Sequence, residues 1–73
     1  MFAWRRCALR RRVILNLKTQ KAFRGVLSAQ RGPLLVLKDV ELLETAREPV
    51  RIDGDVVIER SNVDFVQVLP VEG

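Results

Sequence analysis

The sequence has no histidine, no tyrosine and a single cysteine, Cys7. Without histidine, and with one cysteine, a zinc or haem ligand set cannot be assembled and no internal disulfide can form. We therefore expect no metal, no cofactor and no disulfide. A lone cysteine also fits a reducing compartment, which favours a cytoplasmic location.

Groups that could perform catalysis are equally scarce. A general base would have to be one of the nine carboxylates, and none lies within an apolar segment, the environment that favours a protonated carboxyl group. Asp53 and Asp55 flank Gly54, where aspartate serves turn chemistry, and two carboxylates alone are too few for a metal. Cys7 has arginines nearby but no histidine or asparagine partner. We predict that the chain is not an enzyme.

Long apolar runs are also missing. None exceeds four residues, so the sequence contains neither a bilayer-spanning segment nor the apolar core of a secretory signal. A chain of 73 residues allows one domain with a thin core, and such a domain usually needs a disulfide, a metal or self-association. Since the first two are excluded, we expect self-association.

Acidic residues are absent from the first twelve positions, which divides the chain into a basic arm, residues 1–12, and a body, residues 13–73. The body holds eight basic residues against nine acidic ones, a net charge of −1, so the high pI comes from the arm. Three interpretations of the arm are open: a solvated or subunit-packing tail, an arm that contacts phosphates, or a membrane-surface anchor. The small apolar face argues against the anchor. The phosphate interpretation rests on five arginines that can neutralise a backbone and one aromatic that can stack on a base: Arg5, Arg6, Arg10, Arg11, Arg12 and Trp4.

The body shows a period of two in its apolar residues, which is typical of strands with one buried face. Alternation over 13–17 and 23–27 predicts an antiparallel pair around a polar break at 19–20, with Phe23 and Leu27 facing the core. Gly25 weakens that strand unless the backbone must bend there. We expect a turn at 28–33, a strand at 34–37 that extends toward residue 43, an accessory pair over 50–58 with a tight turn at 53–55, and a last strand over 63–69. This pattern predicts an all-β fold, a small, strongly bent barrel of five antiparallel strands.

The spacing of these apolar residues and of Gly25 resembles the sequence motifs of a known family. The pattern Val13-x-Leu15-x-Leu17, then Phe23-x-Gly25-x-Leu27, then Leu35-x-Leu37-x-Asp39 resembles the first motif of the Sm and Sm-like proteins. The stretches 54–58 and 61–63 resemble their second motif. The chain is also similar to small uncharacterised proteins of actinobacterial phages and prophages.

The resemblance implies the five-stranded barrel, with a short N-terminal helix as a common addition. It also implies a homo-oligomeric ring, commonly of about six or seven copies, in which the fourth strand of one subunit pairs with the fifth strand of the next. Ring closure would satisfy the exposed edge strands. The predicted interface consists of apolar residues in those strands: Val56, Val57, Ile58, Val63, Phe65, Val66 and Val68.

The family's RNA-binding residues are mostly replaced in this sequence. Gln30, Arg31, Gly32 and Pro33 occupy the first loop, where the family carries an acidic residue, and Leu34 lies near its asparagine position. Glu59-Arg60 replaces the family's Arg-Gly pair, and only Asn62 matches a position near the base pocket. Two interpretations remain: Arg31, Arg60 and Asn62 form a different nucleic-acid site, or they belong to solvated loops.

We therefore expect a non-enzymatic Sm-like ring that acts as a structural or adaptor component, encoded by a phage or prophage, with other phage structural proteins as partners and the virion as a second possible location. The alternative is a ring that binds RNA or single-stranded DNA through its arginine-rich arm.

Overall fold

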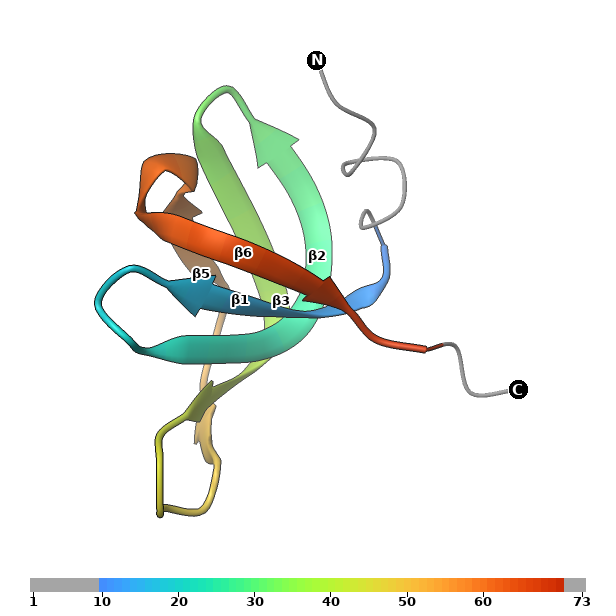
Figure 1. Ribbon diagram of the computed structural model, residues 1–73. Coiled ribbons are helices and arrows are strands. Elements are labelled where there is room, and N and C mark those ends of the chain that lie inside the picture. The colour runs from blue at the N-terminus through green and yellow to red at the C-terminus, as the bar shows by residue number, and fades with distance from the viewer. Residues whose placement is uncertain (1–9, 71–73) are drawn as a thin grey trace.

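The computed structural model describes residues 10–70, which form one antiparallel sheet that bends around a small core (Figure 1). The sheet order is β4-β3-β2-β1-β6, and β5 pairs with a different part of β3 than β4 does. In chain order the elements are β1 (Arg12–Leu17), β2 (Ala22–Arg31), β3 (Leu34–Leu43), β4 (Val50–Ile52), β5 (Val56–Glu59), the 3-10 turn η1 (Arg60–Asn62) and β6 (Val63–Val68). The expectation of a small all-β barrel is confirmed.

The core follows from the alternation seen in the sequence. Each strand sends every second side chain inward, and the bend brings these side chains together. The predicted inward positions of β1 and β2 are correct, with Leu27 fully buried and Phe23 half-buried against the core. The buried apolar residues are Val13, Leu15, Leu27, Leu35, Leu37, Val40 and Ile58.

At Gly25 the backbones of β2 and β3 approach each other closely. Arg24 is opposite Glu41 and Val26 is opposite Lys38, so Gly25 faces two residues of β3, which makes a β-bulge. One of these two, Asp39, has a φ of 53°. A Cβ added at Gly25 would lie 2.8 Å from the carbonyl oxygen of Lys38. The glycine is therefore needed for close approach to the bulged strand.

Residues 28–31 belong to β2, so the predicted turn at 28–33 is wrong in its first part. Only Gly32 and Pro33 separate β2 from β3. A second bulge lies here, since Leu27 is opposite Leu37 while Ala29 is opposite Val36. The extra residue is Ser28, whose hydroxyl donates to the carbonyl oxygen of Val36 at 3.3 Å. Two bulges within one strand pair give the sheet its bend.

The predicted accessory pair over 50–58 is also wrong. β4 and β5 do not pair with each other; both run antiparallel to β3, with Leu42 opposite Val50 and Leu37 opposite Val56. They are two segments of one strand, interrupted where the sequence suggested a tight turn. Gly54 has a φ of 81° at the interruption, so it lets the strand shift course without reversing.

The start of the described chain is tied to the barrel. The amide of Arg10 donates to the carbonyl oxygen of Leu27 at 2.7 Å. The amide of Leu27 in turn donates to the carbonyl oxygen of Arg11 at 3.1 Å. The possible N-terminal helix lies outside residues 10–70. Within that range no helix is long and apolar enough to cross a membrane.

Candidate functional site

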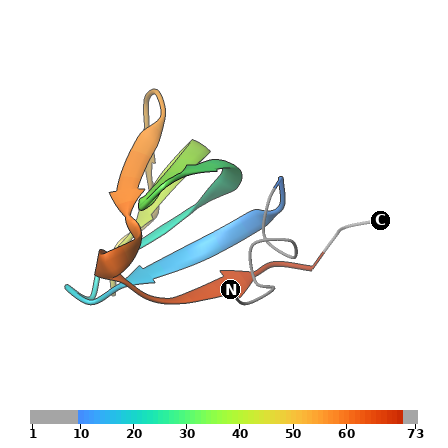
Figure 2. The same cartoon turned by 90° about the horizontal axis from the view of Figure 1, so that it is seen from above.

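Two sheet edges have no backbone partner among residues 10–70. β6 pairs only with β1, whereas β4 and β5 pair only with β3. Figure 2 shows β5 and β6 on opposite sides of the bent sheet, joined at one end by η1. Free edges present rows of unpaired N–H and C=O groups that can pair with another chain.

Exposed apolar side chains lie on these same edge strands. Val57 on β5 is 56% exposed and Phe65 on β6 is 53% exposed. Val68 is 37% exposed at the end of β6. These three residues of the predicted interface are therefore available to a partner.

The remaining predicted interface residues face inward. Ile58 is 6% exposed and belongs to the core of its own subunit, so only its backbone can take part in an interface. Val56, Val63 and Val66 are half-buried against the same core. The sequence pattern did not separate outward from inward positions among these residues. In β6 a register shift at Asn16/Leu17 changes the phase of the strand.

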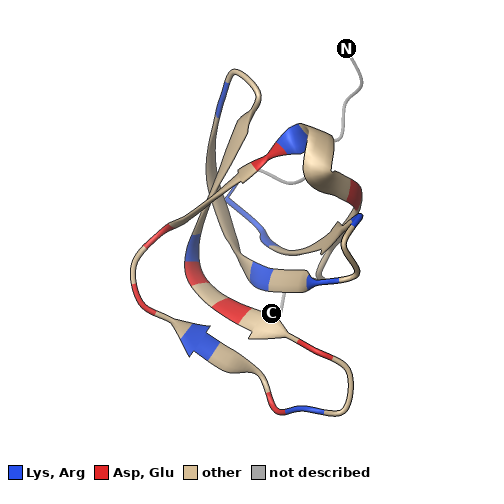
Figure 3. Ribbon diagram, turned by 90° about the vertical axis from the view of Figure 1, so that its left-hand side faces the viewer, with Lys and Arg blue, Asp and Glu red and all other residues tan. Residues whose placement is uncertain are grey.

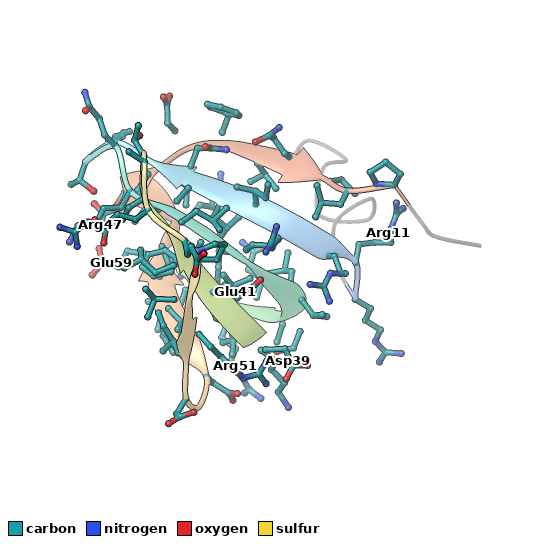
Figure 4. All side chains as sticks on the ribbon, turned by 90° about the horizontal axis from the view of Figure 1, so that it is seen from below. Arg11, Asp39, Glu41, Arg47, Arg51 and Glu59 are labelled. Atoms are coloured by element: carbon teal, nitrogen blue, oxygen red, sulfur yellow. The ribbon has the colours of Figure 1, made fainter. Side chains whose placement is uncertain are left out.

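The arginines at the end of the arm divide into two kinds. Arg11 is half-buried, and its Nη2 donates to the carbonyl oxygen of Leu69 at 2.8 Å, beside the end of β6 (Figure 4). Arg10 and Arg12 are exposed. The other predicted arm residues, Trp4, Arg5 and Arg6, lie outside the described residues.

The two loops of the suggested nucleic-acid site are neighbours. The amide of Arg60 donates to the carbonyl oxygen of Pro33 at 2.7 Å, which joins η1 to the turn that follows Arg31. The amide of Lys18 donates to the carbonyl oxygen of Asn62 at 2.9 Å. Arg31, Arg60 and Asn62 thus lie on adjacent segments. Lys18 joins them, which the sequence did not indicate because it is 44 positions away from Asn62.

Gln30 contributes an unusual group beside this turn. Its Nε2 donates to the carbonyl oxygen of Gly32 at 3.3 Å. Its Oε1 is buried without a hydrogen-bond partner in the structure. Buried polar atoms are normally satisfied, so this oxygen is a free acceptor next to the two loops.

Charge is divided along the chain more sharply than the arm alone suggests. Residues 1–38 hold ten lysines and arginines and no acid, whereas residues 39–73 hold three against nine acids. Figure 3 shows the acidic positions along the second half of β3, the 44–49 loop and the stretch between β4 and β5. Arg24 and Glu41 pair across β2 and β3 at 2.5 Å, and Arg51 lies 3.7 Å from Asp39 (Figure 4).

No group of three or more acidic or cysteine side chains that could hold a metal ion occurs within residues 10–70. The arrangement offers free strand edges and basic loops, which are features of binding surfaces.

Solved structures of Sm proteins share this fold. A heptameric archaeal Sm protein superposes with a TM-score of 0.80 at 23% identity, covering 94% of this chain and 100% of that chain. The Sm protein of Pyrococcus abyssii, solved in complex with a uridine heptamer, gives 0.74 at 28% identity, covering 85% and 87%. The P. aerophilum SmAP1 heptamer gives 0.80 at 22% identity, covering 97% and 100%.

The fold also occurs in a different setting. A chain of the NatC complex bound to CoA gives a TM-score of 0.75 at 19% identity, covering 93% of this chain and 86% of that one. No protein-family model matches the sequence, and no curated protein matches it significantly. The barrel is therefore Sm-like in fold, and none of these comparisons bears on a phage origin.

Proposed function

We propose that the chain assembles head to tail into a closed homo-oligomeric ring through β5 of one subunit and β6 of the next. The observation that carries this proposal is the pair of unpaired edges, each with an exposed apolar side chain, Val57 on one and Phe65 on the other. An exposed apolar edge strand is an aggregation hazard in a monomer. Pairing with a neighbour removes both edges at once.

The faces of the two strands are compatible with such pairing. Val56 and Ile58 of β5 point toward the core, as do Val63 and Val66 of β6. If the sheet continues from β5 into β6 of a neighbour, inward residues meet inward residues and the cores join. Outward, Val57 and Phe65 come to the same face, where a cross-strand aromatic and β-branched pair is favourable.

Contacts between two different edges produce a ring when the rotation between subunits closes, and a filament when it does not. Two of the similar solved structures are heptamers, which supports closure. The small core supports it too, since the seven buried residues among 10–70 leave a domain of this size in need of further burial.

The proposed role of the ring is structural, as a non-enzymatic scaffold or adaptor, and a phage or prophage origin remains part of this proposal. The genes that flank the coding sequence provide its test. Head or tail genes on either side would support a virion component, whereas RNA-processing genes would contradict it.

A second candidate function is binding of single-stranded nucleic acid. It is favoured by the excess of arginines in the arm and by the P. abyssii Sm protein, whose structure contains a uridine heptamer. The replaced loop residues argue against the family's base pocket, which leaves the arm as the binding element. The ratio of absorbance at 260 and 280 nm of the purified protein, before and after a high-salt wash, distinguishes the two candidates.

Substitution of the exposed edge residues tests the ring. We expect Val57→Lys and Phe65→Lys each to give a folded monomer, because both side chains are outside the core and either lysine would place an unpaired charge against an apolar residue of the neighbour. Sedimentation velocity at micromolar concentration measures the size, and circular dichroism measures the fold. Val50→Lys is the matched control, since Val50 is 54% exposed on β4, outside the predicted interface. A wild-type chain that is folded and sediments near 8.4 kDa would contradict the ring.

A further inference from the structure

An acidic stretch without an ionic partner precedes β5. Asp53 and Asp55 lie on either side of Gly54, and both are exposed. Neither forms a salt bridge within residues 10–70, where the neighbouring Arg51 is 3.7 Å from Asp39 instead. Lys38, next to the β3 partner of Val56, makes no salt bridge either within this range. Two carboxylates therefore remain uncompensated beside a free strand edge.

Basic residues that also lack an ionic partner lie beside the C-terminal end of β6. The amide of Leu69 donates to the carbonyl oxygen of Arg12 at 2.9 Å, which brings Arg12 beside the end of that strand. Arg11 reaches across to Leu69 and is occupied there. Arg10 and Arg12 are exposed and form no salt bridge with any described residue. The two charged groups thus accompany the two edges that remain unpaired.

The direction of pairing decides whether these groups meet. In an antiparallel pair, the start of β5 lies opposite the end of β6 of the neighbour, so Asp53 and Asp55 approach Arg10 and Arg12. In a parallel pair, the same acids would lie beside the start of β6, where Asp64 would repel them. Charge therefore favours the antiparallel arrangement.

The distances that this arrangement requires are within reach. β1 neighbours β6 in the sheet, so two strand spacings, about 9.5 Å, separate β5 from the backbone of Arg12 on the next subunit. Within one subunit Arg11 crosses one such spacing, from the start of β1 to Leu69 beside the end of β6, so an arginine on β1 can cover about half of that gap and the aspartate side chain must extend toward it. At the opposite end, antiparallel pairing brings Glu59 toward Lys18, which adjoins Asn62 at the start of β6.

We propose that Asp53 and Asp55 of one subunit form an ionic clamp with Arg10 and Arg12 of the next, and that this clamp fixes the antiparallel direction of assembly. The proposal rests on the proposed ring and names the charged residues that orient it. It also makes assembly dependent on ionic strength, because exposed charges are screened within about 3 Å in 1 M salt.

The test is a dilution series of the full chain followed by sedimentation velocity in 50 mM and in 1 M NaCl. Asp53→Asn/Asp55→Asn removes the two charges with almost no change in shape. Glu44→Gln/Glu48→Gln is the matched control, because it removes two exposed charges from the loop between β3 and β4. We expect the first variant to assemble roughly 2- to 30-fold more weakly than wild type at each interface in low salt, and the control to match wild type.

An exchange of charges completes the test. Asp53→Arg/Asp55→Arg and Arg10→Asp/Arg12→Glu should each weaken assembly, and the two combined in one chain should restore it. Equal assembly of Asp53→Asn/Asp55→Asn and its control would overturn the clamp and leave the ring intact. The same conclusion would follow if Arg10→Asp/Arg12→Glu lost nucleic-acid binding but assembled like wild type. A wild-type chain that stays monomeric in both salts would overturn the ring as well.

Discussion

At the scale of single residues, the bend of the sheet depends on the missing side chain of Gly25. The residue is paired with Val13 on β1 and faces the bulge of β3 on its other side. Its neighbour across the bulge, Asp39, adopts a left-handed conformation that aspartate tolerates better than β-branched residues do. The turn glycine Gly32 differs, because nothing lies within 4 Å of the place where its Cβ would be.

Gly25→Ala should destabilise the protein by about 1–3 kcal/mol, because the new methyl group meets a backbone carbonyl that cannot move without shifting β3. Gly25→Val should cost more. Gly32→Asn is the control, since asparagine tolerates the left-handed conformation and the site is open. Urea unfolding at a fixed subunit concentration gives the free energies. An unchanged midpoint for Gly25→Ala would show that β2 and β3 separate easily at the bulge.

At the scale of elements, a side chain from near the other end of the chain adds a contact beside the end of β6. Arg11 bonds the carbonyl oxygen of Leu69 across 58 positions of sequence. No local pattern could predict this contact, because Arg11 lies in a row of three arginines, residues 10–12, that look alike in the sequence. The structure separates a structural arginine from two exposed ones.

Arg11→Met should loosen the end of β6. We expect a loss of about 1 kcal/mol, because a charge-assisted but partly solvated hydrogen bond disappears while the side-chain stem stays. Amide hydrogen exchange of residues 66–69 should accelerate more than that of β2. The measurement is best made in the Phe65→Lys background, where assembly makes no contribution. Arg12→Met, which removes an exposed arginine, should leave exchange unchanged; equal acceleration in both variants would rule out a specific role for Arg11.

Much of the fold could be predicted from the period of two, and the errors have physical causes. The predicted bounds of β1 and β6 agree with the structure to within about two residues, a usual boundary error. Residues 28–31 resemble a turn in sequence because polar side chains suit both turns and outward strand positions. The stretch around Gly54 resembles a reversal, although its course depends on pairing with β3, which lies far away in the sequence.

The candidate interface was predictable only in part. The sequence indicated β5 and β6 through their apolar composition, which is a property of the whole strand. Whether Ile58 or Val57 faces outward depends on strand phase, and β6 carries a register shift that no residue type signals. The clustering of Lys18 with Asn62 likewise arises from the pairing of β1 with β6.

At the scale of the whole molecule, a ring would gather several arms, so weak phosphate contacts would act together. Binding of single-stranded nucleic acid should therefore be insensitive to sequence and should fall steeply as salt rises. Deletion of residues 2–9, which removes Trp4, Arg5 and Arg6, should weaken it and leave assembly intact, because the deletion spares Arg10, Arg11 and Arg12, which adjoin the barrel. Asn62→Ala should have little effect.

Titration of labelled oligouridine and of mixed-sequence RNA at two salt concentrations measures this binding. The slope of log K against log salt should be shallower in the deletion variant by roughly 0.7 for each phosphate that the deleted arginines would have neutralised. Uridine-selective, salt-tolerant binding by the deletion variant would instead assign recognition to the loops around Pro33 and Asn62, with the free oxygen of Gln30 as an acceptor.

The difference between the two free edges has a consequence for mixtures of intact and defective chains. A subunit with a damaged β5 edge could still attach through β6, after which the growing arc would have no site for the next copy. If a ring has n positions and a fraction f of the subunits is defective, the share of intact rings falls as (1 − f) to the power n. In a cell that expresses both forms, a lesion confined to one edge would therefore act dominantly, whereas a lesion that prevents folding would be recessive.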